Sequence, residues 1–251
     1  MRGLVLLVLL AASAAAGAQV NTERMRGGLE GDTLHLALDA TAAFAAGNTE
    51  YLQLGLGGRL DGRRGPNLAF VVFEARLSRV EDSVFLDRQF VHARYNRRLS
   101  PLLVAEAFGQ LERNRQQRLE ARTLLGAGLR FELVGTDRAG LALGTTPMLE
   151  YERLAEAAGE PPATVVRLST YLSGRLALGD RAALTAVGYV QPRAAEPGDL
   201  RVLAQGALEV GVTRAVRLRV RADLRHDTEP PLGVEPTDVV VENGLVVVIP
   251  G

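Results

Sequence analysis

The chain of 251 residues contains no cysteine, no tryptophan and no lysine, and only 5% of its residues are aromatic. Without cysteine, neither a disulfide framework nor a lipidated-cysteine anchor is available. The 29 basic residues are therefore all arginines, and 29 acidic residues match them, so the formal net charge is zero. A neutral balance argues against electrostatic binding of nucleic acid.

A long apolar run suited to a transmembrane helix is missing from the sequence after residue 18. Before it, Arg2 is followed by the apolar stretch Leu4–Leu10 and by small residues at 16–18, which is the pattern of a secretory signal peptide. We expect a cleaved signal peptide over 1–18, a polar periplasmic lead-in over 19–32 and the folded part over 33–251. An exported chain of this composition can cross a membrane only with strands.

The segment Ala215–Asp227 shows the strongest periodicity in the chain. Its even positions are apolar from Val216 to Leu224, and its odd positions carry arginine or aspartate from Arg217 to Arg225. A period of two predicts a β-strand with an apolar face and a charged face. Two settings satisfy this pattern, namely a soluble sheet with the charges in water and a membrane barrel with the charges in its lumen.

The same alternation recurs along the chain, and it predicts about twelve strands of roughly ten or more residues, long enough to cross a bilayer at a tilt. The predicted strands are Thr33–Ala45, Tyr51–Leu60, Asn67–Ser78, Phe90–Leu99, Leu102–Glu112, Leu119–Leu133, Arg138–Leu154, Val165–Leu178, Ala182–Gln191, Leu200–Val212, Ala215–Asp227 and Thr237–Ile249.

The predicted connections alternate between short and long. Short turns such as Leu99–Leu102 and Gly179–Arg181 alternate with longer segments such as Arg79–Gln89, Ala155–Ala163 and His226–Pro236. The hairpin turn Gly47–Glu50 is an exception, because it is short although it lies at the end with the longer segments. Short turns at one end and longer loops at the other are typical of an outer-membrane barrel with both termini in the periplasm. A soluble antiparallel sandwich has no reason for alternating lengths.

Aromatic girdles, which mark the two membrane interfaces of most barrels, are thin in this sequence. The candidates on the apolar parity near strand ends are Phe44, Tyr51, Tyr95, Phe131 and Tyr151.

Several segments together resemble one bacterial family. They include Val20–Arg24, Ala46–Thr49, His92–Ser100, Gly126–Arg130, Tyr151–Leu154, Arg167–Ser169, Tyr189–Pro192 and Pro230–Asp238. By these segments the chain resembles the salt-induced outer membrane proteins over nearly its whole mature length. The resemblance implies an outer-membrane β-barrel of unknown molecular function. Such proteins end on an aromatic residue read by the barrel-assembly machinery, whereas here Ile249 occupies that parity.

The polar parity of the strands forms the candidate lumen. Its predicted lining is Asp39, Arg59, Glu74, Arg76, His92, Arg94, Arg98, Glu106, Glu120, Arg122, Arg130, Glu150, Arg167, Arg175, Glu209, Arg217, Arg219, Arg221, Asp223 and Arg225. These residues fit a narrow charged pore, with the arginines of Ala215–Asp227 attracting anions. They also fit a network of arginines and carboxylates that fills and seals the interior, because about twelve strands lie between filled barrels and open channels. The similar numbers of both charge signs favour this network over a strongly selective pore.

Patterns for catalysis or metal binding are weak. His35, His92 and His226 have no metal-ligand spacing, and no G-x-S-x-G elbow is present. The glycine-rich stretch 55–58 does not join a strand to a helix, as a phosphate loop must. An outer-membrane phospholipase would need a histidine beside a serine on the lipid face, where none is predicted. We expect no catalytic residue, no metal and no cofactor.

We therefore predict an all-β, antiparallel up-and-down transmembrane barrel of about twelve strands in the bacterial outer membrane. Its role is structural or that of a narrow pore for small solutes or ions. The alternatives are a soluble periplasmic all-β binding protein and, third, an outer-membrane enzyme acting on lipid. The expected partners are outer-membrane lipid, lipopolysaccharide and the assembly machinery. The loop arginines Arg113, Arg115 and Arg118 fit a solvated loop better than a site for lipopolysaccharide phosphates. No nucleic acid is expected.

Overall fold

A computed structural model of the chain describes residues 32–47, 50–213 and 216–247. The predicted signal peptide and lead-in (1–31), part of the first hairpin turn (48–49) and the end of the chain (248–251) lie outside these residues. No helix within the described residues has the length and hydrophobicity needed to span a membrane.

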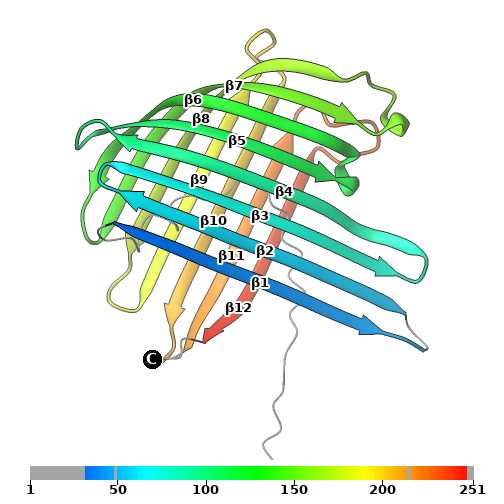
Figure 1. The fold of residues 1–251 in the computed structure, drawn as a ribbon, viewed down its shortest axis with the longest axis horizontal. Coiled ribbons are helices and arrows are strands. Elements are labelled where there is room, and N and C mark those ends of the chain that lie inside the picture. Colours follow the sequence, from blue (N-terminus) through cyan, green and yellow to red (C-terminus); the bar gives the residue numbers. More distant parts are fainter. Residues whose placement is uncertain (1–31, 48–49, 214–215, 248–251) are drawn as a thin grey trace, which may run out of the picture.

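In the described part of the chain, twelve antiparallel strands form one sheet in which every strand pairs with its neighbours in the sequence (Figure 1). The strands are β1 (Thr33–Ala45), β2 (Tyr51–Arg64), β3 (Asn67–Val80), β4 (Ser83–Arg98), β5 (Leu103–Asn114), β6 (Leu119–Gly135), β7 (Ala139–Leu154), β8 (Ala163–Ala177), β9 (Ala182–Pro192), β10 (Leu200–Gly211), β11 (Val216–Asp227) and β12 (Thr237–Val247). The prediction of about twelve strands in an up-and-down order is confirmed.

The sheet rolls up, so that β1 to β5 cross in front of β9 to β12 in Figure 1. Contacts between strands that are far apart in the sheet show the same curvature. The Tyr171 hydroxyl of β8 donates a hydrogen bond to Glu106 of β5 at 2.5 Å, and Arg225 of β11 lies 3.6 Å from Glu112 of β5. Among the described residues, no ladder of hydrogen bonds joins β1 to β12.

The two faces of the rolled sheet differ as the alternation predicts. Apolar side chains such as Leu36, Leu129 and Leu172 point outward and are exposed, whereas polar neighbours such as Arg130 and Ser173 point inward and are buried. This distribution is the reverse of a soluble protein and is the arrangement of a barrel whose outer surface meets lipid.

Long and short connections define the two ends of the barrel. The loop end carries the three longest connections, 155–162, 193–199 and 228–236, together with the short ones 81–82 and 115–118, and the turn end carries short ones such as 65–66 and 99–102. Because the strand number is even, β1 starts and β12 finishes at the turn end.

The prediction of a long loop over Arg79–Gln89 is wrong. β3 runs to Val80 and β4 starts at Ser83, so only Glu81 and Asp82 form the turn. Glu81 adopts a positive φ of 52°, and its N–H donates to the Glu50 carbonyl at 2.9 Å. The charged residues of this segment masked an alternation that continues through Val84, Leu86 and Arg88, because charged residues near a strand end have the same composition as a loop.

A bulge at the start of β6 turns one predicted lumen residue, Glu120, to the outer face. The register between β6 and β7 shifts between Leu119 and Ala121, so two residues of β6 oppose one of β7. Leu119 consequently turns inward and is buried against Leu154 and Ala158. Glu120 points outward, where its carboxylate pairs with exposed Arg153 at 3.1 Å. Glu120 therefore does not line the lumen.

Candidate functional site

Aromatic side chains fill the middle of the barrel on one side. We call this group the ring layer, and it comprises Phe70, Phe90, His92, Phe108, Tyr171 and Tyr189, all on inward positions of β3 to β9. The His92 ring lies between the phenylalanines, with centroid distances of 5.9 Å to Phe70 and 5.7 Å to Phe108. Its Nδ1 lies 3.2 Å from Gln110 Oε1. The ring layer excludes water from this part of the lumen.

Two buried arginines and one glutamate tie the ring layer to the barrel wall. Arg94 lies over the rings of Phe108 and Tyr171, and its Nη1 is 3.8 Å from Glu106. Arg130, only 1% exposed, donates to the Tyr171 hydroxyl and to Ser173. Cations stacked on rings and paired with a carboxylate can be buried without a full desolvation penalty. This wall, formed by β4 to β9, is packed.

Inward-facing glycines make room for the rings. A Cβ on Gly144 would overlap the Tyr171 ring, with its hydroxyl oxygen 2.6 Å away, and a Cβ on Gly126 would lie 2.7 Å from the Phe108 ring. The rings of β5 and β8 therefore lie across the backbones of β6 and β7. Glycines inside strands are explained here by close packing.

The opposite wall of the lumen is open to solvent. The inward side chains of Arg59, Glu74, Arg76, Glu209, Arg219, Arg221 and Glu242 are each between 20% and 32% exposed. They come from β2, β3 and β10 to β12. Most arginines of this wall have a carboxylate neighbour, as in Arg76–Glu74 at 2.8 Å and Arg219–Glu209 at 2.7 Å. The open wall is therefore charged, with both signs present.

A second charged group crosses the lumen at the loop end. We call it the mouth network, and its members are Arg88, Arg122, Arg167, Arg201 and Arg225 with Glu112, Glu150, Glu152, Asp199 and Asp227. Arg201 is its centre, with contacts of 2.6 Å to Glu150, 3.2 Å to Glu152 and 2.8 Å to Asp227. Each guanidinium is paired with carboxylates from other strands or from the β9–β10 connection, so the network links β4 to β8 with β10 and β11.

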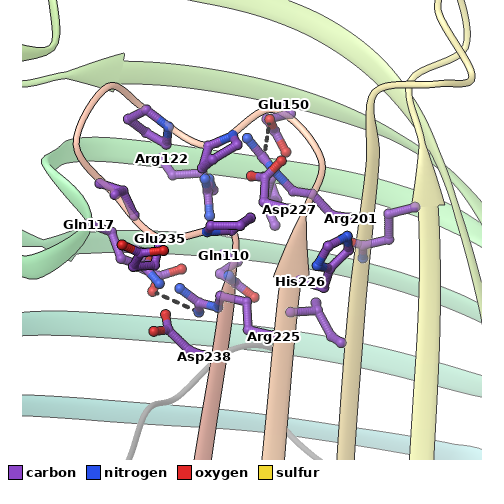
Figure 2. Close-up of a pocket in the computed structure, with 18 residues that line it drawn as sticks. Gln110, Gln117, Arg122, Glu150, Arg201, Arg225, His226, Asp227, Glu235 and Asp238 are labelled. Carbon is purple, nitrogen blue, oxygen red and sulfur yellow. Dashed lines mark hydrogen bonds and ion pairs between the residues drawn. The ribbon is translucent and has the colours of Figure 1, made fainter.

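A cavity of about 60 Å³, partly open to solvent, lies at the loop end above the mouth network (Figure 2). Its walls are inward residues of β5 to β7 and β9 to β12, including Gln110, Glu112 and Gln191, and its apolar part contains Leu124 and Leu203. The β11–β12 loop supplies the rest of the lining, namely Pro230, Pro231, Val234, Glu235 and Pro236. The loop thus narrows the mouth of the barrel.

Local interactions hold the β11–β12 loop in place. Thr228 donates its hydroxyl to the Gly198 carbonyl at 2.8 Å, and the Val234 N–H donates to the Pro231 carbonyl at 2.9 Å. Prolines restrict the backbone between these contacts. Gly233 has a positive φ of 75°, and a Cβ there would lie 2.8 Å from the guanidinium of Arg118.

Gly233→Val is expected to lift the β11–β12 loop from Arg118 without unfolding the barrel. A β-branched side chain is strained at this φ and collides with the guanidinium, and a cost of about 1.4 kcal/mol corresponds to about tenfold in the loop equilibrium. Limited proteolysis should then cleave within 228–236 about tenfold faster. Gly159→Val, at a φ of 73° with nothing near its Cβ, is the control. Equal cleavage of both variants at 228–236 would contradict the contact with Arg118.

The structure brings most predicted lumen residues to the inner face. The packed wall and mouth network contain His92, Arg94, Glu106, Arg122, Arg130, Glu150, Arg167 and Arg225, and the open wall contains Arg59, Glu74, Arg76, Glu209, Arg219 and Arg221, with Asp223 buried beside Arg221. Arg98 and Arg217 are exposed at the turn end of their rows. Arg175 donates to the turn carbonyls of Thr136 and Asp137. The Asp39 side chain lies outside the described part.

Two groups of residues were missed from the sequence. The aromatic residues of the ring layer occupy the same alternate positions as the polar residues, as Tyr171 does between Ser169 and Ser173. The alternation alone would therefore have predicted that these rings point into the lumen. The lining residues of the β11–β12 loop had no signal, because a loop has no period that predicts its direction. Among the described residues, no three histidine, aspartate or glutamate side chains are placed to hold a metal ion.

Comparisons with known proteins agree with this fold. A solved structure of the NanC porin superposes with a TM-score of 0.52 and 10% sequence identity, covering 85% of this chain and all of that one. At this identity the likeness is one of fold. No curated protein matches the sequence. The model of a protein family described as "Protein of unknown function, DUF481" matches residues 38–249, which is most of the chain. The chain therefore belongs to the DUF481 family.

Proposed function

We propose that the protein is an outer-membrane β-barrel with a narrow, charged path for small solutes or ions along its open wall. The packed wall of β4 to β9 reduces the lumen to this side. Lined by arginines and carboxylates together, the path would pass small polar solutes and discriminate weakly between ion signs. The likeness to a porin fold supports the proposal, and no catalytic step forms part of it.

The observation that carries the proposal is the difference in exposure between the two walls. Inward residues at the same parity are buried on β4 to β8, where Arg130 is 1% and Arg167 is 2% exposed. On the open wall the Arg219 side chain is 32% exposed. Charged side chains stay solvated in a membrane barrel only where water enters the lumen, because the bilayer core offers no hydrogen bonds.

The orientation follows from the connections. In outer-membrane barrels the short turns face the periplasm, which would place the loop end and the β11–β12 loop at the cell surface. Lipopolysaccharide would then surround the loop end, and the assembly machinery would insert the chain. The resemblance to salt-induced outer membrane proteins suggests expression under salt stress, which a comparison of transcript levels at low and high salt would test.

Charge reversal on the open wall should change ion selectivity. The double variant R219E/R221E is expected to shift the reversal potential toward cations in planar bilayers under a salt gradient, because two guanidiniums facing the path become carboxylates. R138E, in the exposed β6–β7 turn, is the matched control. Unchanged selectivity in a conducting double variant would place the path elsewhere.

A sealed, structural barrel is the second candidate, and one contact favours it. Arg225 and Glu112 reach across the lumen between β11 and β5 with a separation of 3.6 Å. A barrel closed by this contact would show no conductance although it shifts mobility on boiling in SDS. A soluble periplasmic protein, the third alternative, would be released by carbonate and show no such shift.

A further inference from the structure

The cavity at the loop end has an excess of carboxylates that the mouth network does not use. Within the network, guanidiniums and carboxylates match one another. Glu235 and Asp238 also line the cavity; Asp238 acts on the Arg225 guanidinium through its charge, but within the described part of the chain neither carboxylate takes part in a side-chain hydrogen bond or an ion pair within 4 Å. Figure 2 shows Asp238 next to Arg225, its partner in the β11–β12 register, with Glu235 close by. The lining is therefore acidic on the side of the loop.

A buried acceptor in the same cavity lacks a donor. Glu112 is 5% exposed and lines the cavity, and its Oε1 accepts no hydrogen bond. The nearest nitrogens, from Arg88 and Arg225, are each 3.6 Å away, which is beyond hydrogen-bond length. A buried carboxylate oxygen without a donor costs free energy. A ligand that donates a hydrogen bond would remove this cost.

The remaining lining describes the rest of the ligand. Gln110 and Gln191 place amides in the wall, and Leu124, Leu203 and the loop prolines form an apolar part. The cavity volume of about 60 Å³ admits a few water molecules or a small, slender ligand. Since the arginines are already matched by carboxylates, an anion would meet uncompensated negative charge. A cation with N–H donors and a short apolar body fits instead.

We propose that the cavity between the β11–β12 loop and the mouth network binds a small organic amine. The ammonium group would lie between Glu235 and Asp238, and a second donor would reach Glu112 Oε1. The methylene groups would contact Pro231 and Leu203. This inference needs a folded barrel but not a conducting one, so it stands apart from the proposed path.

Calorimetric titration of the full chain, folded in detergent micelles, tests this site. The probes are putrescine, which has two donor ends, tetramethylammonium, which has the charge without donors, and acetate. Putrescine should bind saturably, at least about fivefold more tightly than tetramethylammonium because of the donor to Glu112, and acetate should not bind. Absence of saturable putrescine binding, or tighter binding of acetate, would overturn the proposal.

Variants locate the binding within the cavity. E235Q and D238N are each expected to weaken putrescine binding about fivefold, and the double variant more than tenfold. E229Q removes the same charge from the same loop, but Glu229 does not line the cavity, so its affinity should match the wild type. The boiling shift in SDS confirms that each variant is folded. Equal losses in E229Q and E235Q would mean attraction by the loop charge alone and would refute a defined site.

Discussion

Gly144→Ala is expected to destabilise the folded barrel by about 2–3 kcal/mol, although alanine is ordinarily tolerated in a strand. The new methyl group would occupy the position of the Tyr171 ring. That ring cannot move away, since its hydroxyl is held by Glu106 and Arg130 and its face packs on Tyr189 at 5.1 Å. Urea unfolding in micelles, followed by the loss of the boiling shift, measures the change.

Gly188→Ala provides the matched comparison for this variant. Gly188 lies in β9, and no atom lies within 4 Å of the position that its new methyl group would take, so this substitution should change the free energy of unfolding by less than about 0.5 kcal/mol. In a Tyr171→Leu background, Gly144→Ala should lose much of its cost, because the ring that it strikes is gone. Equal costs of Gly144→Ala in both backgrounds would refute the packing argument.

Glu106→Leu, beside the ring layer, should destabilise the folded barrel by about 3–5 kcal/mol, more than Gly144→Ala. It removes the carboxylate beside Arg94, which is 4% exposed, and the acceptor of the Tyr171 hydroxyl. The cost arises from a cation left in an apolar, stacked environment where water cannot replace the carboxylate. Thermal unfolding in micelles, read by the boiling shift, measures it.

Two further variants separate burial from pairing. Glu120→Leu removes one member of the exposed pair with Arg153 on the outer face and should cost less than about 1 kcal/mol. The double variant Glu106→Leu/Arg94→Leu should recover a large part of the loss, since both buried charges are then absent. If Glu120→Leu proved as damaging as Glu106→Leu, the ring layer would not be the stabilising interior that we describe.

Much of the architecture could be read from the sequence by itself. The alternation that starts at Thr33 and recurs to β12 determined the strands, their order and the face of nearly every arginine, because a period of two is a local property of an extended backbone. It failed where the backbone departs from that period. The bulge at Glu120 reversed one side chain, and the charged ends of β3 and β4 were mistaken for a loop.

Only the tertiary structure decided which charges are buried and which are wet. Arg130 and Arg219 both point into the barrel from polar positions of their strands. Arg130 lies against Tyr171 in the packed wall, whereas Arg219 faces solvent. The difference depends on what stands opposite across the lumen, and that is set by strands up to six places apart in the sheet. The direction of the β11–β12 loop likewise depends on contacts with Arg118 and Leu200, which no local pattern encodes. The alternation along a strand determines which face of the sheet a side chain is on, but the curvature of the sheet determines which side chains it meets on that face.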